Sequence, residues 1–279
     1  LPSSSFNGSL LPGYALPASI SNLQNLVWMD LTGTGLASLS LIVAPLPSLT
    51  ALSMSNNQLS VLPAAFVRVL PVVSELNLQE NRLTALPNEL TLMTSLNLLD
   101  LDYNPLNHFP SVICSLPALA SLIMEQVGLT GAAVPECIAQ LVHLSSLDLT
   151  SNALVSLPES LSSLTNLQTL YVENNQLTSL PSQIGNLRSL TELYVSGNNL
   201  TTFPASYCNL TSLAVLLASS NQLTALPPWG AYKYLAVAAF SSNLLTALPP
   251  RFSMTSENPL SATFSGNRIA TIPQSVCGI

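Results

Sequence analysis

The sequence predicts a solenoid, a coil in which each turn of the chain contacts only the turns next to it. The stretch LQTLYVENNQLTSLPSQIGNLRSL, residues 167–190, returns before and after itself with the same spacing of apolar residues, one Asn and one Pro. A period in the twenties held over many units is typical of solenoids. Eleven such units align, and they start at Leu26, Leu49, Val73, Leu96, Leu119, Leu144, Leu167, Leu190, Leu213, Leu235 and Pro259.

Each unit contains one short strand pattern. In residues 167–175, Leu170 and Val172 are expected to face the core, whereas Thr169, Tyr171 and Glu173 face outward. Because such a strand buries only one face, equivalent strands of successive turns are expected to pair in parallel. We therefore predict about eleven parallel strands with a continuous row of buried aliphatic side chains behind them.

An Asn follows most of these strands, and a Pro follows the next pair of apolar residues. A stacked Asn side chain can bond the backbone groups that a tight turn leaves unpaired inside a coil. Leu177 and Leu180 then return to the core, and Pro181 prevents a helix from starting early. The recurring residues are Asn57, Asn81, Asn104, Asn152, Asn175, Asn198, Asn221, Asn243 and Asn267.

The units resemble the leucine-rich repeat family, and the 23-residue pattern LPxxIxxLxxLxxLxLxxN is similar to that of Ras-associated scaffold proteins and their plant and protist relatives. The resemblance covers residues 26–279 and implies an α/β-type horseshoe with a concave parallel sheet and short helical or extended convex segments. It implies binding rather than one activity. We expect residues 1–25 to be an irregular half-repeat or cap, and the repeat domain to continue or be capped beyond residue 279.

Composition excludes several classes of function. A net charge of −7, with no basic stripe, argues against nucleic-acid binding. The longest apolar run, LSLIVAPLPSL, is too short to span a membrane. His108 and His143 are isolated from nucleophiles and from metal-ligand patterns, so neither an enzyme nor a metal or cofactor is expected.

The acidic residues gather on the outward strand positions. Nine of the 13 acids lie there and none of the six bases does. This pattern predicts either a merely solubilising face or a concave strip for a basic or hydroxyl-rich partner, which would be a Lys/Arg-rich protein segment, a glycan or Ca²⁺ held by Asp102 and Glu125. The predicted contact residues are Asp100, Asp102, Tyr103, Glu125, Asp148, Tyr171, Glu173, Glu192 and Tyr194.

The cysteines and glycosylation sequons bear on location. Cys114 and Cys137 fall on adjacent turns and can form a disulfide, although all four cysteines can equally be small buried hydrophobes. Asn-x-Ser/Thr sequons occur at Asn7, Asn199 and Asn209. Together with the low charge content, these features favour an extracellular or cell-surface location over a cytoplasmic one.

Three functions remain open. The first is a non-catalytic extracellular recognition module that uses the acidic, Tyr-bearing concave face. The second is a building block of a filament or coat, in which open solenoid ends associate with further copies. The third is a cytosolic signalling scaffold. One irregular segment, residues 127–138, is either a tolerated bulge or a local change of curvature that shapes a site.

Overall fold

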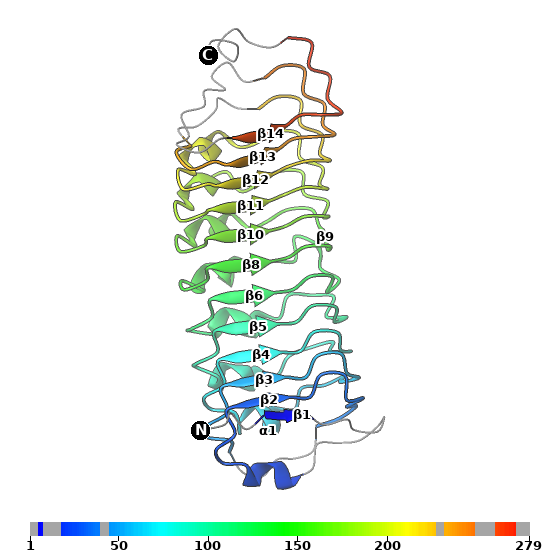
Figure 1. The fold of residues 1–279 in the computed structure, drawn as a ribbon, viewed down its shortest axis with the longest axis vertical. Coiled ribbons are helices and arrows are strands. Elements are labelled where there is room, and N and C mark those ends of the chain that lie inside the picture. The colour runs from blue at the N-terminus through cyan, green and yellow to red at the C-terminus, as the bar shows by residue number, and fades with distance from the viewer. Residues whose placement is uncertain (1–4, 8–17, 40–44, 227–231, 249–259, 272–279) are drawn as a thin grey trace. The chain divides into compact units, whose positions relative to one another are not determined.

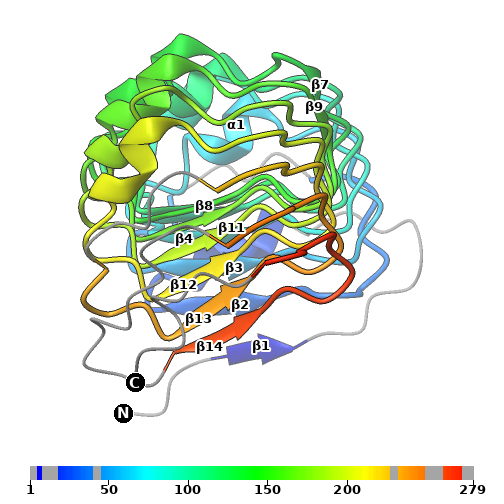
Figure 2. The same ribbon diagram turned by 90° about the horizontal axis from the view of Figure 1, so that it is seen from above.

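The computed structural model describes residues 5–7, 18–39, 45–226, 232–248 and 260–271. The chain divides into two compact units, Leu1–Leu129 and Thr130–Ile279. In each unit, short parallel strands lie side by side in one sheet (Figure 1), and short helices lie on the opposite side of the coil (Figure 2). We call the outward side chains of the strands the sheet face and the opposite side the helix side.

The first unit pairs six described strands in chain order, each parallel to the next. Its helices include one α-helical turn and three 3₁₀-helices. The strands are β1 (Ser5–Asn7), β2 (Trp28–Asp30), β3 (Ala51–Ser53), β4 (Glu75–Asn77), β5 (Leu98–Asp100) and β6 (Ser121–Ile123), and the helices are η1 (Ala18–Asn22), α1 (Ala64–Val67), η2 (Asn88–Leu92) and η3 (Ser111–Ser115).

The second unit repeats this arrangement, again with parallel pairing between consecutive strands of the sheet. The strands are β8 (Ser146–Asp148), β10 (Thr169–Tyr171), β11 (Glu192–Tyr194), β12 (Val215–Leu217), β13 (Val237–Ala239) and β14 (Ser261–Thr263), and the helices are η4 (Glu136–Gln140), η5 (Glu159–Ser163), η6 (Ile184–Asn186) and η7 (Ala205–Asn209).

The core follows the predicted alternation. In β10, Leu170 is fully buried between the half-buried Thr169 and Tyr171, and Val172 is buried again. The eleven strands expected from the repeat pattern are all present, and the core positions behind them are aliphatic in nearly every turn. Since one short strand can bury little surface, this stacked row supplies the apolar burial that holds each unit together.

The Asn that follows most strands ties one turn to the turn before it. The side-chain amide of Asn104, 1% exposed, donates to the carbonyls of Leu78 and Leu101 at 2.9 and 3.0 Å, and its oxygen accepts the Leu83 N–H at 2.9 Å. These bonds satisfy backbone groups that the turn would otherwise bury unpaired, as the sequence predicted. Buried residues with the same bonding are Asn57, Asn81, Asn175, Asn198, Asn221 and Asn243.

On the helix side, a Pro is usually the last residue before the helix begins. Pro87 and Pro110 are extended, and their carbonyls accept the first turn bonds from Leu90 and Ile113. Because the proline ring fixes φ and lacks an N–H, proline suits the start of a helix but not its interior. Successive helices lie close enough that a Cβ at Gly185 would sit 1.9 Å from the Ser206 carbonyl oxygen.

Two segments differ from the simple repeat. Residues 5–7, in the stretch expected to be irregular, form β1, and Ser5 pairs with Trp28. Parallel pairing uses backbone groups, so a strand forms there without the leucine pattern. In the lengthened repeat, β7 (Thr130–Gly131) pairs with β9 (Ala153–Leu154) in a separate two-stranded sheet, which gives the inserted residues a regular place.

Within the described residues, no helix is both long enough and apolar enough to cross a membrane. The end of the chain on which the expected self-association depends, residues 272–279 with Cys277, lies outside the described residues.

Candidate functional site

Several acids of the sheet face have a structural role that the sequence analysis missed. The last strand position holds Asp30, Asn77, Asp100 or Asp148, and each side-chain oxygen accepts the N–H two residues further on, at 2.8 to 3.1 Å. Short Asp and Asn side chains readily bond their own backbone two residues further on, and Ser or Thr does so more weakly. Part of the acidic bias therefore comes from turn formation rather than from ligand binding.

Asp100 and Asp102, two of the predicted contact residues, are each only 8% exposed. Asp100 bonds the Asp102 N–H, and Asp102 in turn accepts the Glu125 N–H at 2.5 Å. The Asp100 carboxylate thus bonds its own turn, whereas the Asp102 carboxylate bonds the backbone of the next repeat. In the described part of the chain no three His, Cys, Asp or Glu residues gather into a metal-binding group.

In the first unit, Tyr103 and Glu125 form a pair on the sheet face. Tyr103 is 38% exposed, with a left-handed backbone φ of 55°. The hydrogen bond to Glu125, together with the negative charge of that carboxylate, raises the pKa of Tyr103. The pair therefore presents a neutral hydroxyl bonded to a carboxylate at the surface.

In the second unit, two tyrosines make an aromatic platform. Tyr171 of β10 pairs with Tyr194 of β11, and their rings stack with centroids 4.6 Å apart and an angle of 18°. The Tyr194 hydroxyl donates to Glu192 Oε2 at 2.9 Å. Parallel register places equivalent side chains side by side, so the platform follows directly from Tyr at the same position of two successive repeats.

Carboxylates surround this platform. Burial and the nearby Glu192 carboxylate raise the pKa of Tyr194 to about 12. Burial, reinforced by the negative charge of Asp148, raises the pKa of Glu173, and a hydrogen bond from Ser196 opposes the rise. The negative charges of these neighbouring carboxylates repel one another, so the carboxylates together attract a cation. The aromatic strip formed by Asp148, Tyr171, Glu173, Glu192 and Tyr194 is therefore the strongest candidate for a binding surface in the second unit.

The sequence analysis did not find a hollow in the sheet face of the first unit. Its volume is about 290 Å³. The signal available in the sequence was the pair of small residues Ala51 and Ser53 on β3, flanked by Trp28 and Glu75 on the neighbouring strands. The lining residues are Trp28, Ala51, Leu52, Ser53, Glu75, Asn77, Leu98, Asp100 and Ile123.

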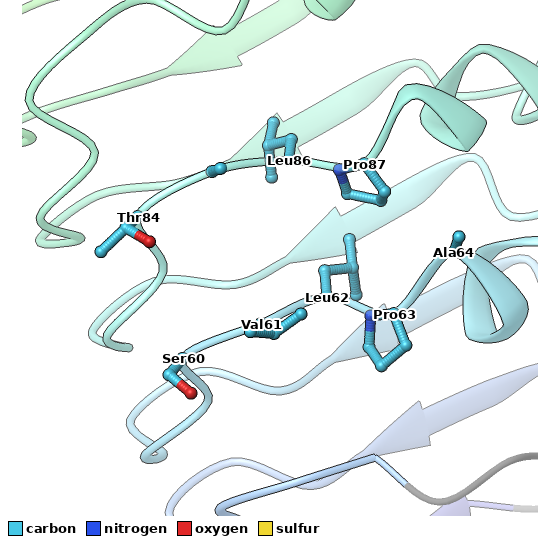
Figure 3. A pocket seen from close by; sticks show the side chains of 9 residues that line it. Ser60, Val61, Leu62, Pro63, Ala64, Thr84, Leu86 and Pro87 are labelled. Atoms are coloured by element: carbon cyan, nitrogen blue, oxygen red, sulfur yellow. The ribbon is translucent and has the colours of Figure 1, made fainter.

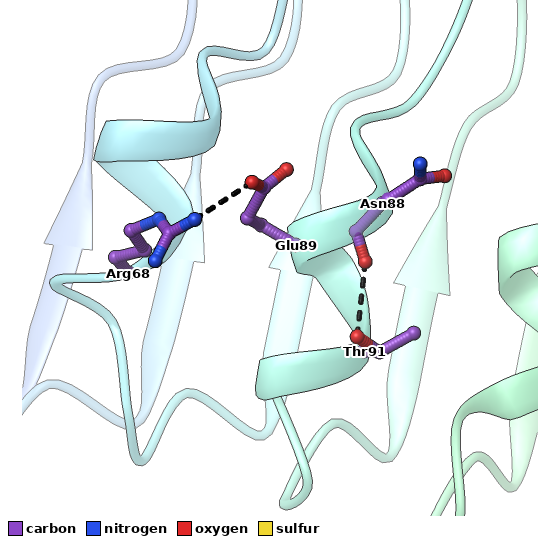
Figure 4. Close-up of polar contacts among 4 residues, drawn as sticks. All are labelled: Arg68, Asn88, Glu89 and Thr91. Atoms are coloured by element: carbon purple, nitrogen blue, oxygen red, sulfur yellow. Dashed lines mark hydrogen bonds and ion pairs between the residues drawn. The ribbon is translucent and has the colours of Figure 1, made fainter.

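The helix side differs in its electrostatics. Arg68 and Glu89 form an ion pair at 2.8 Å, beside a bond from Thr91 Oγ1 to the Asn88 carbonyl (Figure 4). A bond to its own backbone, followed by the bond from Arg68, lowers the pKa of Glu89. The Arg68–Glu89 ion pair lies on the helix side, and in the described part of the chain Glu173 and Glu192 of the sheet face form no ion pair with a base.

A second hollow, of about 280 Å³, lies between two successive turns of the first unit (Figure 3). Val61, Leu62 and Pro63 line it from one turn, and Leu86 and Pro87 from the next. Ser60 and Thr84 supply its only side-chain hydroxyls, and no charged group lines it. It offers apolar contact but little chemistry to orient a ligand.

Of the cysteines, Cys114 and Cys137 are both disulfide-bonded, whereas Cys208 is a free thiol. Their pairing with each other remains a prediction. Among the sequons, Asn199 and Asn209 are exposed, and Asn7 lies in β1. A disulfide and accessible sequons are compatible with an oxidising, glycosylating compartment.

These features define a repeat-solenoid protein. Its short strands are parallel and in register, a row of asparagines lies inside the coil, and in most repeats a Pro precedes the helix. Comparison with protein families gives the specific family. The family described as Leucine-rich repeat region matches residues 130–226, and the one described as Leucine Rich Repeat matches residues 48–69. A solved leucine-rich repeat protein of Leptospira interrogans has 30% sequence identity and a TM-score of 0.86, over 97% of this chain and 67% of that protein. The chain belongs to the leucine-rich repeat family.

Two receptor structures share the fold at lower identity. A TDR receptor is 24% identical with a TM-score of 0.72, over 94% of this chain and 51% of that chain. The plant peptide hormone receptor RGFR1, solved in complex with RGF2, is 21% identical with a TM-score of 0.65, over 94% of this chain and 52% of that chain. At this level of identity the likeness concerns the fold alone.

Proposed function

We propose that the protein is a non-catalytic recognition module whose sheet face binds a basic segment of a protein partner. The carrying observation is the aromatic strip, in which the stacked Tyr171 and Tyr194 lie beside Glu173 and Glu192, two carboxylates that form no ion pair with a described base. A hydroxyl-rich glycan is the alternative ligand, because a stacked tyrosine pair also suits a sugar ring.

The electrostatics favour the basic segment. Lysine and arginine side chains approaching the strip gain from Glu173 and Glu192, and their alkyl stems cover the tyrosine rings. Removing those carboxylates should cost little stability, since they are outward-facing and do not bond the turns as Asp100 does. It should reduce affinity and flatten the dependence of binding on salt.

The test compares two charge-matched triple variants by surface plasmon resonance with an immobilised octalysine peptide at several salt concentrations. The sheet-face variant is Glu125→Gln/Glu173→Gln/Glu192→Gln. The control removes three acids of the helix side, Glu89→Gln/Glu136→Gln/Glu159→Gln, and so changes the net charge equally.

We expect the sheet-face variant to bind about tenfold more weakly with a shallower salt slope, and the control to stay within about twofold of wild type. Equal losses in the two variants would mean that the peptide senses only net charge, and the proposal would fail. A glycan ligand would appear as oligosaccharide binding that depends on the tyrosines and is insensitive to salt.

We also propose an extracellular or cell-surface location. The disulfide-bonded Cys114 and Cys137 and the exposed sequons at Asn199 and Asn209 support it. The fold is shared with the ectodomain of an Arabidopsis thaliana membrane receptor kinase, at 24% identity. Intact mass of native material, before and after glycosidase treatment, tests the proposal. An unmodified mass together with fully reduced cysteines would favour a cytoplasmic scaffold instead.

A further inference from the structure

The hollow in the sheet face of the first unit has a simple origin. Strands β2, β3 and β4 lie side by side (Figure 1), and one register row across them holds Trp28, Ala51 and Glu75. The methyl group of Ala51 leaves an open slot between the indole and the carboxylate. Leu98, the next residue of the same row, and Ile123 on β6 extend the slot with half-buried apolar surface.

The two walls of this slot are available for contact. Trp28 is 41% exposed, and no described ring stacks on it. Glu75 is exposed, and it has neither a hydrogen-bond nor an ion-pair partner in the described part of the chain. The indole of Trp28 and the carboxylate of Glu75 both face outward, with the small Ala51 between them. The fold of the repeat does not require this combination.

We propose that this slot binds one arginine side chain of a partner's basic segment. This inference rests on the proposed function and names the side chain that the first unit selects. Strands two apart in a sheet are separated by about 9.6 Å, so a planar cation between Trp28 and Glu75 lies within about 6 Å of the indole and in bonding range of the carboxylate.

Arginine fits the slot better than lysine. Its flat guanidinium stacks on an aromatic face and donates two parallel bonds to a carboxylate, whereas an ammonium is a compact, strongly hydrated charge. Its alkyl stem has an apolar surface to cover at Leu98 and Ile123. The neighbouring carboxylates of Asp30 and Asp100 repel an acidic ligand at the same place and favour a cation over a neutral ligand.

The test follows the indole N–H signal of Trp28 by NMR during titration with N-acetyl-arginine amide. The lysine analogue and the citrulline analogue, which has the shape of arginine without its charge, serve as comparison probes. We expect saturable shifts with arginine, binding at least about threefold weaker with lysine, and none with citrulline.

Two variants address the two requirements of the slot. Glu75→Gln, which removes the charge and keeps the shape, should weaken arginine binding about tenfold. Ala51→Leu, which fills the slot without changing any charge, should abolish the shifts while leaving the unfolding midpoint of the protein unchanged. Glu136→Gln, on helix η4 of the helix side, is the matched control and should bind the arginine probe as wild type does.

An unmoved Trp28 signal, or equal binding by Glu75→Gln and wild type, would overturn the slot. That failure is distinct from a failure of the proposed function. If the slot fails while the sheet-face triple variant still loses octalysine, the recognition module stands and its specificity lies elsewhere. If the slot binds arginine while the triple variant loses nothing, the aromatic strip is a solvated surface.

Discussion

Replacement of one internal asparagine should destabilise the protein far more than replacement of its neighbour. Asn198 is 5% exposed, and its side chain donates to the Val172 carbonyl at 2.8 Å and accepts the Leu177 N–H at 2.9 Å. It also donates to the Val195 carbonyl of its own turn at 3.0 Å. In Asn198→Ala, the Leu177 N–H is left without a partner inside the coil, where water cannot replace the bond, and the Val172 carbonyl keeps only the bond from the Asn175 side chain at 3.2 Å.

The expected cost follows from these groups. One buried N–H left without a partner costs about 1–3 kcal/mol, and each further buried bond that is lost costs about 1 kcal/mol, so the change should lower the free energy of unfolding by about 2–4 kcal/mol. Asn199 is the matched control, because it is the same residue one position along, is exposed, and bonds only the Gln222 side chain at 3.3 Å. Asn199→Ala should cost less than about 1 kcal/mol.

Urea unfolding followed by far-ultraviolet circular dichroism measures both variants, in protein produced without glycosylation so that loss of the Asn199 sequon has no effect. The slope of the transition should stay the same, which shows that the variants unfold by the same process. If the two variants lie within about 1 kcal/mol of each other, the asparagine row does not hold the turns together and the reasoning is refuted.

Three further outcomes are expected. Gly197→Ala should lower the free energy of unfolding by about 1–2 kcal/mol, because φ is +68° and the new Cβ would lie 2.5 Å from Asn174 Oδ1; an unchanged urea midpoint would contradict this. Because the pKa of Tyr194 is raised to about 12, the stability that this tyrosine contributes is complete below the unfolded pKa near 10 and is lost as pH rises through 12. An ultraviolet titration of Tyr194→Phe should show one late-ionising tyrosine fewer than wild type, and an unchanged titration would contradict this. Non-reducing peptide mapping should recover Cys114 linked to Cys137, and finding either residue as a free thiol would disprove that pairing.

The repeat architecture could be predicted because the same local pattern is repeated many times in one sequence. A single L-x-L followed by Asn is weak evidence, but its return at a constant spacing fixes which residues are stacked on one another. The burial of Leu170 and Val172 and the bonding of Asn175 both follow from that stacking.

The site was predictable only in part, because outward positions are not restricted by the core. Alternation shows that Asp100 and Tyr171 leave the core, but it does not show that a short carboxylate bonds its own turn while a long aromatic side chain stacks on the next strand. The hollow escaped prediction for a related reason. It depends on the relative sizes of Trp28, Ala51 and Glu75, which belong to three different repeats and become neighbours only in the sheet.

The asparagine bonds have a direction, and this has a consequence for how the protein is made. The Leu177 N–H is satisfied by Asn198, a residue synthesised 21 positions later, and Leu154 depends on Asn175 in the same way. A ribosome adding 5–20 residues per second therefore completes each turn about 1–4 s after the chain has passed it. During translation the newest turn therefore has unpaired backbone groups until the next turn has been made, and the asparagine bonds form in order from the N-terminus toward the ribosome.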